Sequence, residues 1–160
     1  MKFSTQEEYG IRCLLRIARA GAGAGLTIPE ISQAEGLSDA NVAKLLRILR
    51  LGGFVEATRG RVGGYSLARR PADISISEVL HVLGGKLVEE DFCEAFSGGS
   101  GKLCVHAIDC TIFSLWETIQ HAVDQALSRV TLHDMIPHTP EDLQPHHSSF
   151  LPTLPTIAAP

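Results

Sequence analysis

Apolar residues recur every three or four positions through the first third of the chain, and this spacing predicts a run of short helices. Residues 5 to 20 form the first predicted helix, and the glycine-rich run at 21 to 25 ends it. Thr27 and Glu30 then match a capping box, which indicates that a second helix starts here and continues to about residue 34. The apolar positions of the first helix include Tyr9, Leu14, Ile17 and Ala18.

A third helix and a β-hairpin are predicted next. Ser38 marks the start of the helix and Gly52 its end, and the apolar residues between them are Val42, Leu45, Leu46 and Leu49. Residues 54 to 58 and 65 to 67 have the composition of two short strands, and Gly63 and Gly64 allow the positive backbone angles that a tight turn needs. The order of elements, mainly α with a small β-hairpin wing, predicts a winged helix-turn-helix.

The second half of the chain is predicted to contain a short helix and a long one. Ser75 and Glu78 match a second capping box, and the glycines after residue 83 end the short helix. From about residue 109 to 130 the three-and-four spacing is kept by Ile112, Leu115, Trp116, Ile119, Val123, Ala126, Leu127 and Val130. A small domain would leave much of this apolar stripe exposed, so we expect the long helix to pack against the same helix of a second subunit. The alternative is that it folds back over its own domain.

These patterns divide the chain into four segments. Residues 1 to 84 form the winged helix-turn-helix domain, and residues 85 to 110 form a loop that carries three cysteines. Residues 111 to 136 form the dimerisation helix with one further turn. Residues 137 to 160 hold six prolines and no sustained periodicity, which predicts a disordered tail.

Charge is distributed unevenly along the chain. With 160 residues and 44% hydrophobic composition, the protein can bury one modest core. Residues 1 to 71 carry eleven Lys/Arg against six Asp/Glu, whereas the remainder carries three against twelve, so the net charge of −4 hides a basic half. No run of about 18 apolar residues occurs, and acidic residues stand where a signal peptide would be apolar. We therefore expect a cytoplasmic protein with no membrane partner.

The basic half suggests double-stranded DNA as a partner. The third helix can enter a groove, while Arg59 and Arg61 at the hairpin tip can meet phosphates or the minor groove. The predicted DNA-binding residues are Ser38, Asn41, Lys44, Arg47, Arg59, Arg61 and Tyr65. No nucleophile–base set or paired-carboxylate constellation stands out, and the glycine run at 21 to 25 lacks the preceding strand of a nucleotide loop. An enzyme is not predicted.

Three of the four cysteines lie together, with Cys93 and Cys104 separated by ten residues and Cys104 and Cys110 by five. They can serve as zinc ligands, as redox thiols or as ligands of an iron–sulphur cluster, and their spacing does not choose among these. Cys110 lies near the start of the long helix, where the helix dipole favours a thiolate. Cys13 lies among leucines of the first helix and is predicted to be a core residue.

Four stretches of the sequence resemble the IscR/NsrR/RirA family of winged-helix iron–sulphur transcription regulators. They are the opening MKFSTQEEYGIRCLL, the segment LSDANVAKLLRILRLGGFVEATRGRVGGYSLAR, the following DISISEVL, and the cysteine trio. The resemblance covers about residues 1 to 136. It implies a homodimer whose long helices cross and whose loops each hold a [2Fe-2S] or [4Fe-4S] cluster through Cys93, Cys104 and Cys110.

The fourth cluster ligand varies within that family. Some members use a histidine three residues after the last cysteine, but Phe113 stands there in this chain. Other members use an acidic residue of the partner's first helix, which Glu8 matches, and His106 within the loop is the second candidate. The resemblance implies a repressor of iron–sulphur assembly, iron, or redox and nitrosative stress genes. The alternative is a DNA-binding regulator with a structural zinc site or a cysteine thiol switch and no cluster.

Overall fold

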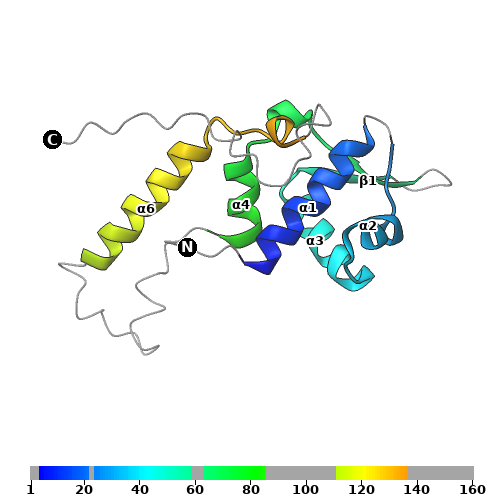
Figure 1. Cartoon of the computed structure of the whole chain (residues 1–160), viewed down its shortest axis with the longest axis horizontal. Helices are drawn as coiled ribbons and strands as arrows, with labels where there is room; N and C mark the ends of the chain where they lie inside the picture. The colour runs from blue at the N-terminus through cyan, green and yellow to red at the C-terminus, as the bar shows by residue number, and fades with distance from the viewer. Residues whose placement is uncertain (1–3, 22–23, 59–62, 86–110, 137–160) are drawn as a thin grey trace.

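The computed structural model describes residues 4–21, 24–58, 63–85 and 111–136, and it confirms a mainly helical fold with a two-stranded hairpin (Figure 1). The helices are α1 (Thr5–Ala20), α2 (Ile28–Glu35), α3 (Asp39–Leu51), α4 (Ile76–Gly84) and α6 (Thr111–Leu127). The strands are β1 (Val55–Thr58) and β2 (Gly64–Leu67), and the 3-10 turns are η1 (Pro71–Asp73) and η2 (His133–Met135). None of the described helices is both long enough and apolar enough to cross a membrane.

The first three helices start where their sequences provide hydrogen-bonding caps. The N–H of Thr27 and its hydroxyl both donate to Glu30 at 2.7 Å, and these hydrogen bonds lower the pKa of the Glu30 carboxyl. Ser38 Oγ accepts from the Asn41 N–H at 3.3 Å and so begins α3. A further capping box, absent from the sequence-based expectations, begins α1, and there Ser4 Oγ accepts from the Glu7 N–H at 3.2 Å.

The start of α4 differs from the prediction, because Ser75 and Glu78 do not form a capping box. The Ser75 side chain makes no capping hydrogen bond, and Glu78 instead accepts from Arg69 at 3.2 Å. The N–H of Ile76 donates to the Val130 carbonyl at 3.0 Å. A returning segment of chain therefore satisfies one of the backbone donors that the first turn of a helix leaves without an intrahelical partner.

The hairpin is joined by backbone hydrogen bonds to the linker between α1 and α2, near the end of its strands that leads to the tip. β1 and β2 pair antiparallel, and Tyr65 also exchanges backbone hydrogen bonds of 2.7 and 3.0 Å with Leu26. Gly64 crosses the backbone of Gly25 and Leu26 so closely that a Cβ atom on it would lie 2.8 Å from their carbonyl carbons. Glycine is required here by the close approach of two backbones.

We expect Gly64→Ala to lower the free energy of unfolding by about 1 to 3 kcal/mol, because the added methyl group meets backbone that cannot move without breaking the Leu26–Tyr65 pairing. Urea unfolding followed by circular dichroism measures this. Ser66→Ala, in the same strand, serves as the control and should stay within about 0.5 kcal/mol of the wild type. Equal stability of the two variants would contradict the close crossing.

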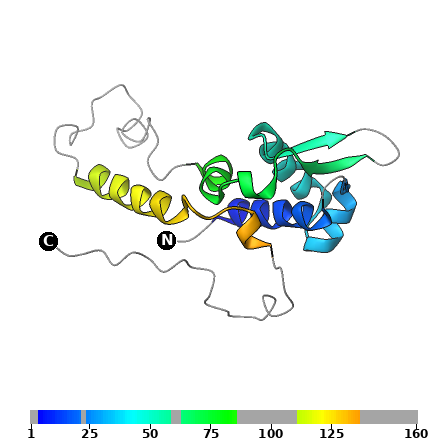
Figure 2. The ribbon, with the colours of Figure 1, turned by 90° about the horizontal axis from the view of Figure 1, so that it is seen from above.

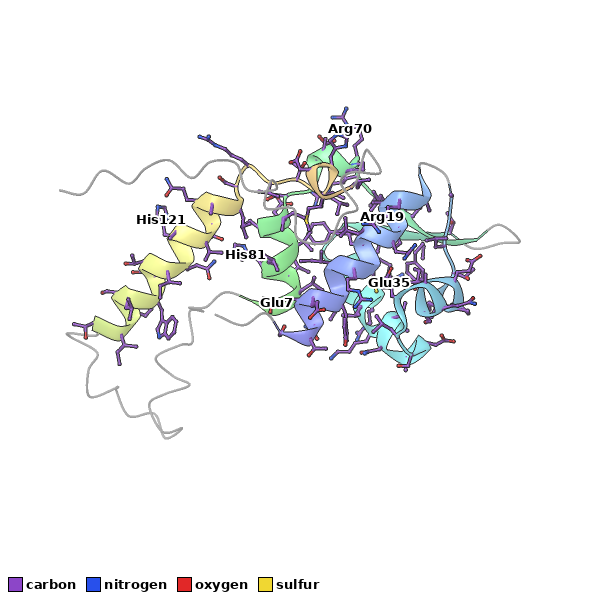
Figure 3. The ribbon with its side chains drawn as sticks, viewed as in Figure 1. Glu7, Arg19, Glu35, Arg70, His81 and His121 are labelled. Atoms are coloured by element: carbon purple, nitrogen blue, oxygen red, sulfur yellow. The ribbon has the colours of Figure 1, made fainter. Side chains whose placement is uncertain are left out.

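Seen from two directions, the hairpin and α6 lie at opposite ends of the molecule (Figures 1 and 2). Between them, α1 is joined to the end of α2 by Glu35, whose carboxylate accepts from Arg12 Nε at 3.0 Å and from Arg16 Nε at 2.7 Å (Figure 3). Arg12 also donates to the backbone carbonyl of Glu35 at 3.0 Å. The Arg12 side chain therefore both caps the C-terminal end of α2 and forms an ion pair with the Glu35 carboxylate. These contacts hold α2 in place directly before the turn that leads into α3.

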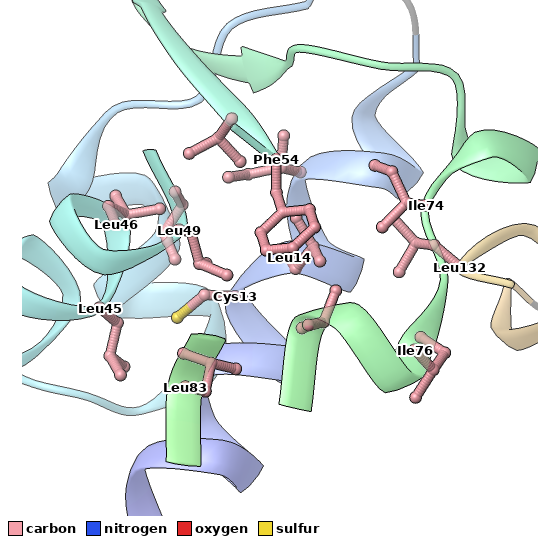
Figure 4. Close-up of a cluster of buried hydrophobic side chains, with 14 of the residues drawn as sticks. Cys13, Leu14, Leu45, Leu46, Leu49, Phe54, Ile74, Ile76, Leu83 and Leu132 are labelled. Carbon is pink, nitrogen blue, oxygen red and sulfur yellow. The ribbon is translucent and has the colours of Figure 1, made fainter. Parts of the chain in front are cut away.

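The core lies among α1, α3, α4 and the base of β1 (Figure 4). Leu14 of α1, Leu46 of α3 and Phe54 before β1 are among its fully buried side chains. Leu132, from the far end of the chain, is equally buried and lies beside Ile74. The core of the winged helix-turn-helix therefore includes a residue that follows α6 in sequence.

α6 ends at Leu127, three residues before the predicted end at Val130, because the chain then turns back onto the domain. The N–H of Leu132 donates to the Ile74 carbonyl at 2.9 Å, and Thr131 forms a β-bridge with Ser75. The Thr131 hydroxyl also donates to Asp134 at 2.7 Å and begins the turn η2. Residues 130 to 132 therefore form backbone hydrogen bonds with residues 74 to 76 instead of continuing α6.

Candidate nucleic-acid interface and sensor segment

One face of α3 is apolar and buried, and the other is basic and exposed. Val42, Leu45, Leu46 and Leu49 point into the core, whereas Asn41, Lys44 and Arg47 lie on the outward side. Within the described residues, neither Lys44 nor Arg47 makes an ion pair or a side-chain hydrogen bond. Two cations three residues apart on a helix lie on the same face, so both can meet a DNA groove and its phosphates.

The turn between α2 and α3 sets the angle of this basic face. Gly36 takes the left-handed conformation with φ of 67°, and the Leu37 N–H donates to the Ser32 carbonyl at 3.1 Å. Ser38, which the sequence predicts to contact DNA, also serves through its hydroxyl as the cap of α3. A role of Ser38 in DNA binding stays a prediction, as does that of Asn41, Lys44 and Arg47.

The hairpin points away from the domain, but the residues predicted to meet DNA at its tip, Arg59 and Arg61, lie outside the described residues. Tyr65, the second residue of β2, is half-buried and packs against the core. Its backbone is paired on both sides, with Ala57 and with Leu26. The contact of Tyr65 with DNA stays a prediction, and its backbone pairing shows a structural role that the sequence did not indicate.

The prediction that Cys13 belongs to the core is confirmed. Its side chain is fully buried, and this burial, together with the nearby charge of Glu35, raises the pKa of the thiol to about 11. At neutral pH it is a protonated thiol without solvent access, which makes it a poor nucleophile and a poor metal ligand. Any cysteine chemistry must therefore involve the other three cysteines.

Cys93, Cys104, Cys110 and His106 lie outside the described residues, in the segment 86–110 that joins α4 to α6. Among the described residues, no three or more His, Cys, Asp or Glu side chains are grouped so that they could hold a metal ion. Of the predicted cluster ligands, the structure therefore describes Glu8 alone.

Glu8 lies on the exposed side of the first turn of α1. Its neighbour Glu7 accepts from the Ser4 N–H at 2.6 Å and lies beside Gly84, at the end of α4. Gln6 donates to the Leu83 carbonyl, so the first turn of α1 touches α4 just before the cysteine-bearing segment begins. In the described part of the chain, the Glu8 carboxylate makes no hydrogen bond or ion pair, so its oxygens are available to act as a ligand.

α6 is exposed over its N-terminal half. Ile112 is 60% exposed, Leu115 55% and Trp116 37%, which is unusual for large apolar side chains on one helix face. Its C-terminal half packs against α4, and Leu127 and Val130 contact the core. The apolar stripe thus continues from the domain core along a helix that projects into solvent (Figure 2).

Comparison with known proteins matches this arrangement to transcription regulators. The sequence profile of the Rrf2 family, described as an iron-dependent transcriptional regulator, matches residues 3–138. Protein rrf2 of Nitratidesulfovibrio vulgaris is 32% identical over 136 residues, which cover 85% of this chain and 87% of that protein. The regulator CymR of Bacillus subtilis is 27% identical over 139 residues, 87% of this chain and 92% of that protein.

Solved structures give the same result for the fold. The structure of T. potens IscR superposes with a TM-score of 0.66 at 27% identity, covering 92% of this chain and 94% of that one. The structure of B. subtilis CymR, described as the global cysteine regulator, gives a TM-score of 0.64 at 28% identity. This superposition covers 87% of this chain and 98% of the CymR chain. Both likenesses extend beyond the winged helix-turn-helix to α6.

Proposed function

The chain belongs to the Rrf2 family of DNA-binding transcription regulators, and on that premise we propose that it is a homodimeric regulator that senses an iron–sulphur cluster. The observation that carries the proposal is the place of the cysteines. The segment that contains Cys93, Cys104 and Cys110 runs from the end of α4 to the start of α6, between the DNA-binding domain and the exposed apolar helix. Thiolates at such a junction can hold a [2Fe-2S] or [4Fe-4S] cluster.

A cluster with three cysteine ligands needs a fourth ligand, and Glu8 of the partner subunit is the first candidate. Two features of Glu8 support this: its carboxylate is exposed, and no described side chain pairs with it. Glu7 and Glu35 are unsuitable because Glu7 caps α1 and Glu35 pairs with two arginines. His106, within the cysteine-bearing segment, is the second candidate.

The dimer is proposed to form through α6. Ile112, Leu115 and Trp116 leave an apolar surface in water that a second copy of the same helix can cover. Two-fold symmetry would then place two α3 helices against two half-sites of a palindromic operator. The target genes would be those for iron–sulphur assembly, iron, or redox and nitrosative stress, with the protein acting as a repressor.

Anaerobic purification tests the cluster directly. We expect brown protein with visible absorbance that contains both iron and sulphide. Cys104→Ser should abolish the colour because it removes a thiolate ligand, and the control Cys13→Ala should keep it because Cys13 is a fully buried residue of the core. Wild-type protein that remains colourless after reconstitution with iron and sulphide would contradict the cluster proposal.

The similarity to CymR, the global cysteine regulator of B. subtilis, favours a second candidate function. In this alternative, the same three cysteines form a thiol switch or a structural zinc site, and no cluster assembles. The same sample separates the candidates. Zinc without iron and sulphide, or a reversible disulfide in metal-free protein, would support the alternative.

Glu8→Gln tests the fourth ligand. We expect the cluster still to form but to lose its absorbance several times faster in air, because a neutral amide is a weaker ligand than a carboxylate. Folding should be unchanged, since Glu8 is exposed. Glu117→Gln, an exposed glutamate on α6, is the matched control. An unchanged spectrum and lifetime for Glu8→Gln would exclude Glu8 and make His106→Ala the next variant.

A further inference from the structure

Four polar side chains meet between α4 and α6, and neither the DNA-binding face nor the cysteine-bearing segment contains them. One of the four, His81, is labelled in Figure 3 between the two helices. Ser77 and His81 come from α4, and Gln120 and Asp124 come from α6, each pair one helical turn apart. We call this group the α4–α6 joint. Asp124 is its centre, because the same oxygen, Oδ1, lies 3.0 Å from Ser77 Oγ, 3.0 Å from Gln120 Nε2 and 2.9 Å from His81 Nε2.

The joint is partly shielded from water, since the side chains of His81 and Asp124 are 29% and 34% exposed. Burial raises the pKa of Asp124, but hydrogen bonds from Gln120 and Ser77 and the neighbouring His81 outweigh it, and the net shift is downward. The carboxylate is therefore ionised at neutral pH. Ser77 and Gln120 donate to this charged oxygen, and His81 adds a third hydrogen bond when its Nε2, which also lies 3.1 Å from Gln120 Nε2, carries a proton. These contacts define the direction of α6 more narrowly than apolar packing, because hydrogen bonds depend on angle as well as distance.

α4 connects the joint to the DNA-binding face. Two residues beyond His81, the Leu83 side chain fills the space over Gly10 of α1, where an added Cβ would lie 2.5 Å from it. Val82 comes similarly close to Gly52, at the end of α3. α4 is thus packed closely against both α1 and α3. Because α4 and α3 are packed together, any rotation of α6 relative to α4 also rotates α6 relative to α3, the helix proposed to enter the DNA groove.

We propose that Asp124 is a positioning residue for DNA binding, which fixes the angle between α6 and the winged helix-turn-helix and thereby the separation of the two recognition helices in the dimer. The proposal rests on the dimer formed through α6 in the proposed function, and it is independent of the cluster. If α6 defines the dimer axis, its angle to the domain decides whether both α3 helices reach their half-sites at once.

The test compares two DNA duplexes, one with two half-sites and one with a single half-site, taken from an operator selected in vitro with the wild-type protein. We expect the wild type to prefer the duplex with two half-sites by roughly a hundredfold or more, because the second contact is intramolecular. Asp124→Ala should reduce this preference to about tenfold or less. Its affinity for the single half-site and its dimeric state should remain those of the wild type.

Two further variants separate positioning from simple loss of structure. Asp124→Asn keeps an acceptor oxygen for Ser77 and Gln120 but removes the charge that attracts His81, so it should restore part of the preference. Glu117→Ala removes one exposed acidic group from the same helix and should behave as the wild type. A wild-type preference in Asp124→Ala, or equal reductions in affinity for both duplexes, would overturn the proposal. If the wild-type protein is monomeric or binds no DNA, the proposed function is overturned together with this proposal. If the wild-type protein is a dimer that binds DNA but remains colourless, only the proposal of a cluster is overturned.

Discussion

Replacing Lys44 and Arg47 together with alanine is expected to weaken operator binding roughly a hundredfold or more, since each base or phosphate contact of this kind contributes about 1 to 3 kcal/mol. Both side chains lie on the outward face of α3, and among the described residues neither is paired with an acidic group. The fold should be unaffected, because the buried face of α3 consists of Val42 and three leucines. Fluorescence anisotropy with a labelled duplex measures the change in affinity.

The salt dependence of the same variant distinguishes binding to phosphates from binding to bases. The slope of the logarithm of affinity against the logarithm of salt concentration should decrease by about one for each phosphate that the variant no longer neutralises. Arg19→Ala with Arg129→Ala removes the same charge from exposed positions on α1 and after α6, and it serves as the matched control. Equal weakening in the control and in the α3 variant would show that net charge, and not the α3 face, governs DNA binding.

Placing aspartate at Leu115 and Trp116 is expected to convert the proposed dimer into a monomer at micromolar concentration. Each large apolar side chain that leaves a buried interface costs about 1.5 to 3 kcal/mol, and two such side chains are replaced in each subunit. The introduced charges would also be buried without partners if the dimer formed. Operator affinity should fall by roughly a hundredfold, because the two half-sites are then bound independently. Analytical ultracentrifugation reports the dissociation.

The control for this variant places the same two charges on the other side of α6. By helical spacing, Ser114 and His121 lie opposite the apolar stripe, and both are exposed, so Ser114→Asp with His121→Asp should remain dimeric. A dimer that survives aspartate at Leu115 and Trp116 would contradict assembly through this face. Dissociation of both variants would indicate that added charge alone separates the subunits.

Local patterns in the sequence are sufficient to predict the three helices and the hairpin of the winged domain. Apolar spacing identifies the buried face of α3, and short-range polar pairs such as Thr27 with Glu30 identify helix starts, because both partners lie within one helical turn. The outward face that carries Lys44 and Arg47 follows directly from the same spacing. This part of the candidate site can be predicted without coordinates.

Interactions between distant parts of the chain cannot be predicted in this way. Ser77 and Asp124 are 47 residues apart, and Arg12 and Glu35 are 23 apart. Nothing in their immediate neighbours marks them as partners, although a histidine among the apolar residues 79 to 83 of α4 is a weak signal for the α4–α6 joint. The prediction of a capping box at Ser75 is wrong for the same reason. Glu78 pairs with Arg69, and the Ile76 N–H donates to Val130, and neither contact is visible in the sequence pattern around Ser75.

The position of Leu132 in the core has a consequence for the way the protein is made. A chain emerging from the ribosome contains α1 to α4 long before it contains Leu132, so the core beside Ile74 stays open until α6 and the residues after it have been synthesised. The cysteine-bearing segment is therefore already present when the DNA-binding domain closes. A chain truncated before residue 132 would therefore have an incomplete core, and the DNA-binding domain would lack a residue that its packing requires.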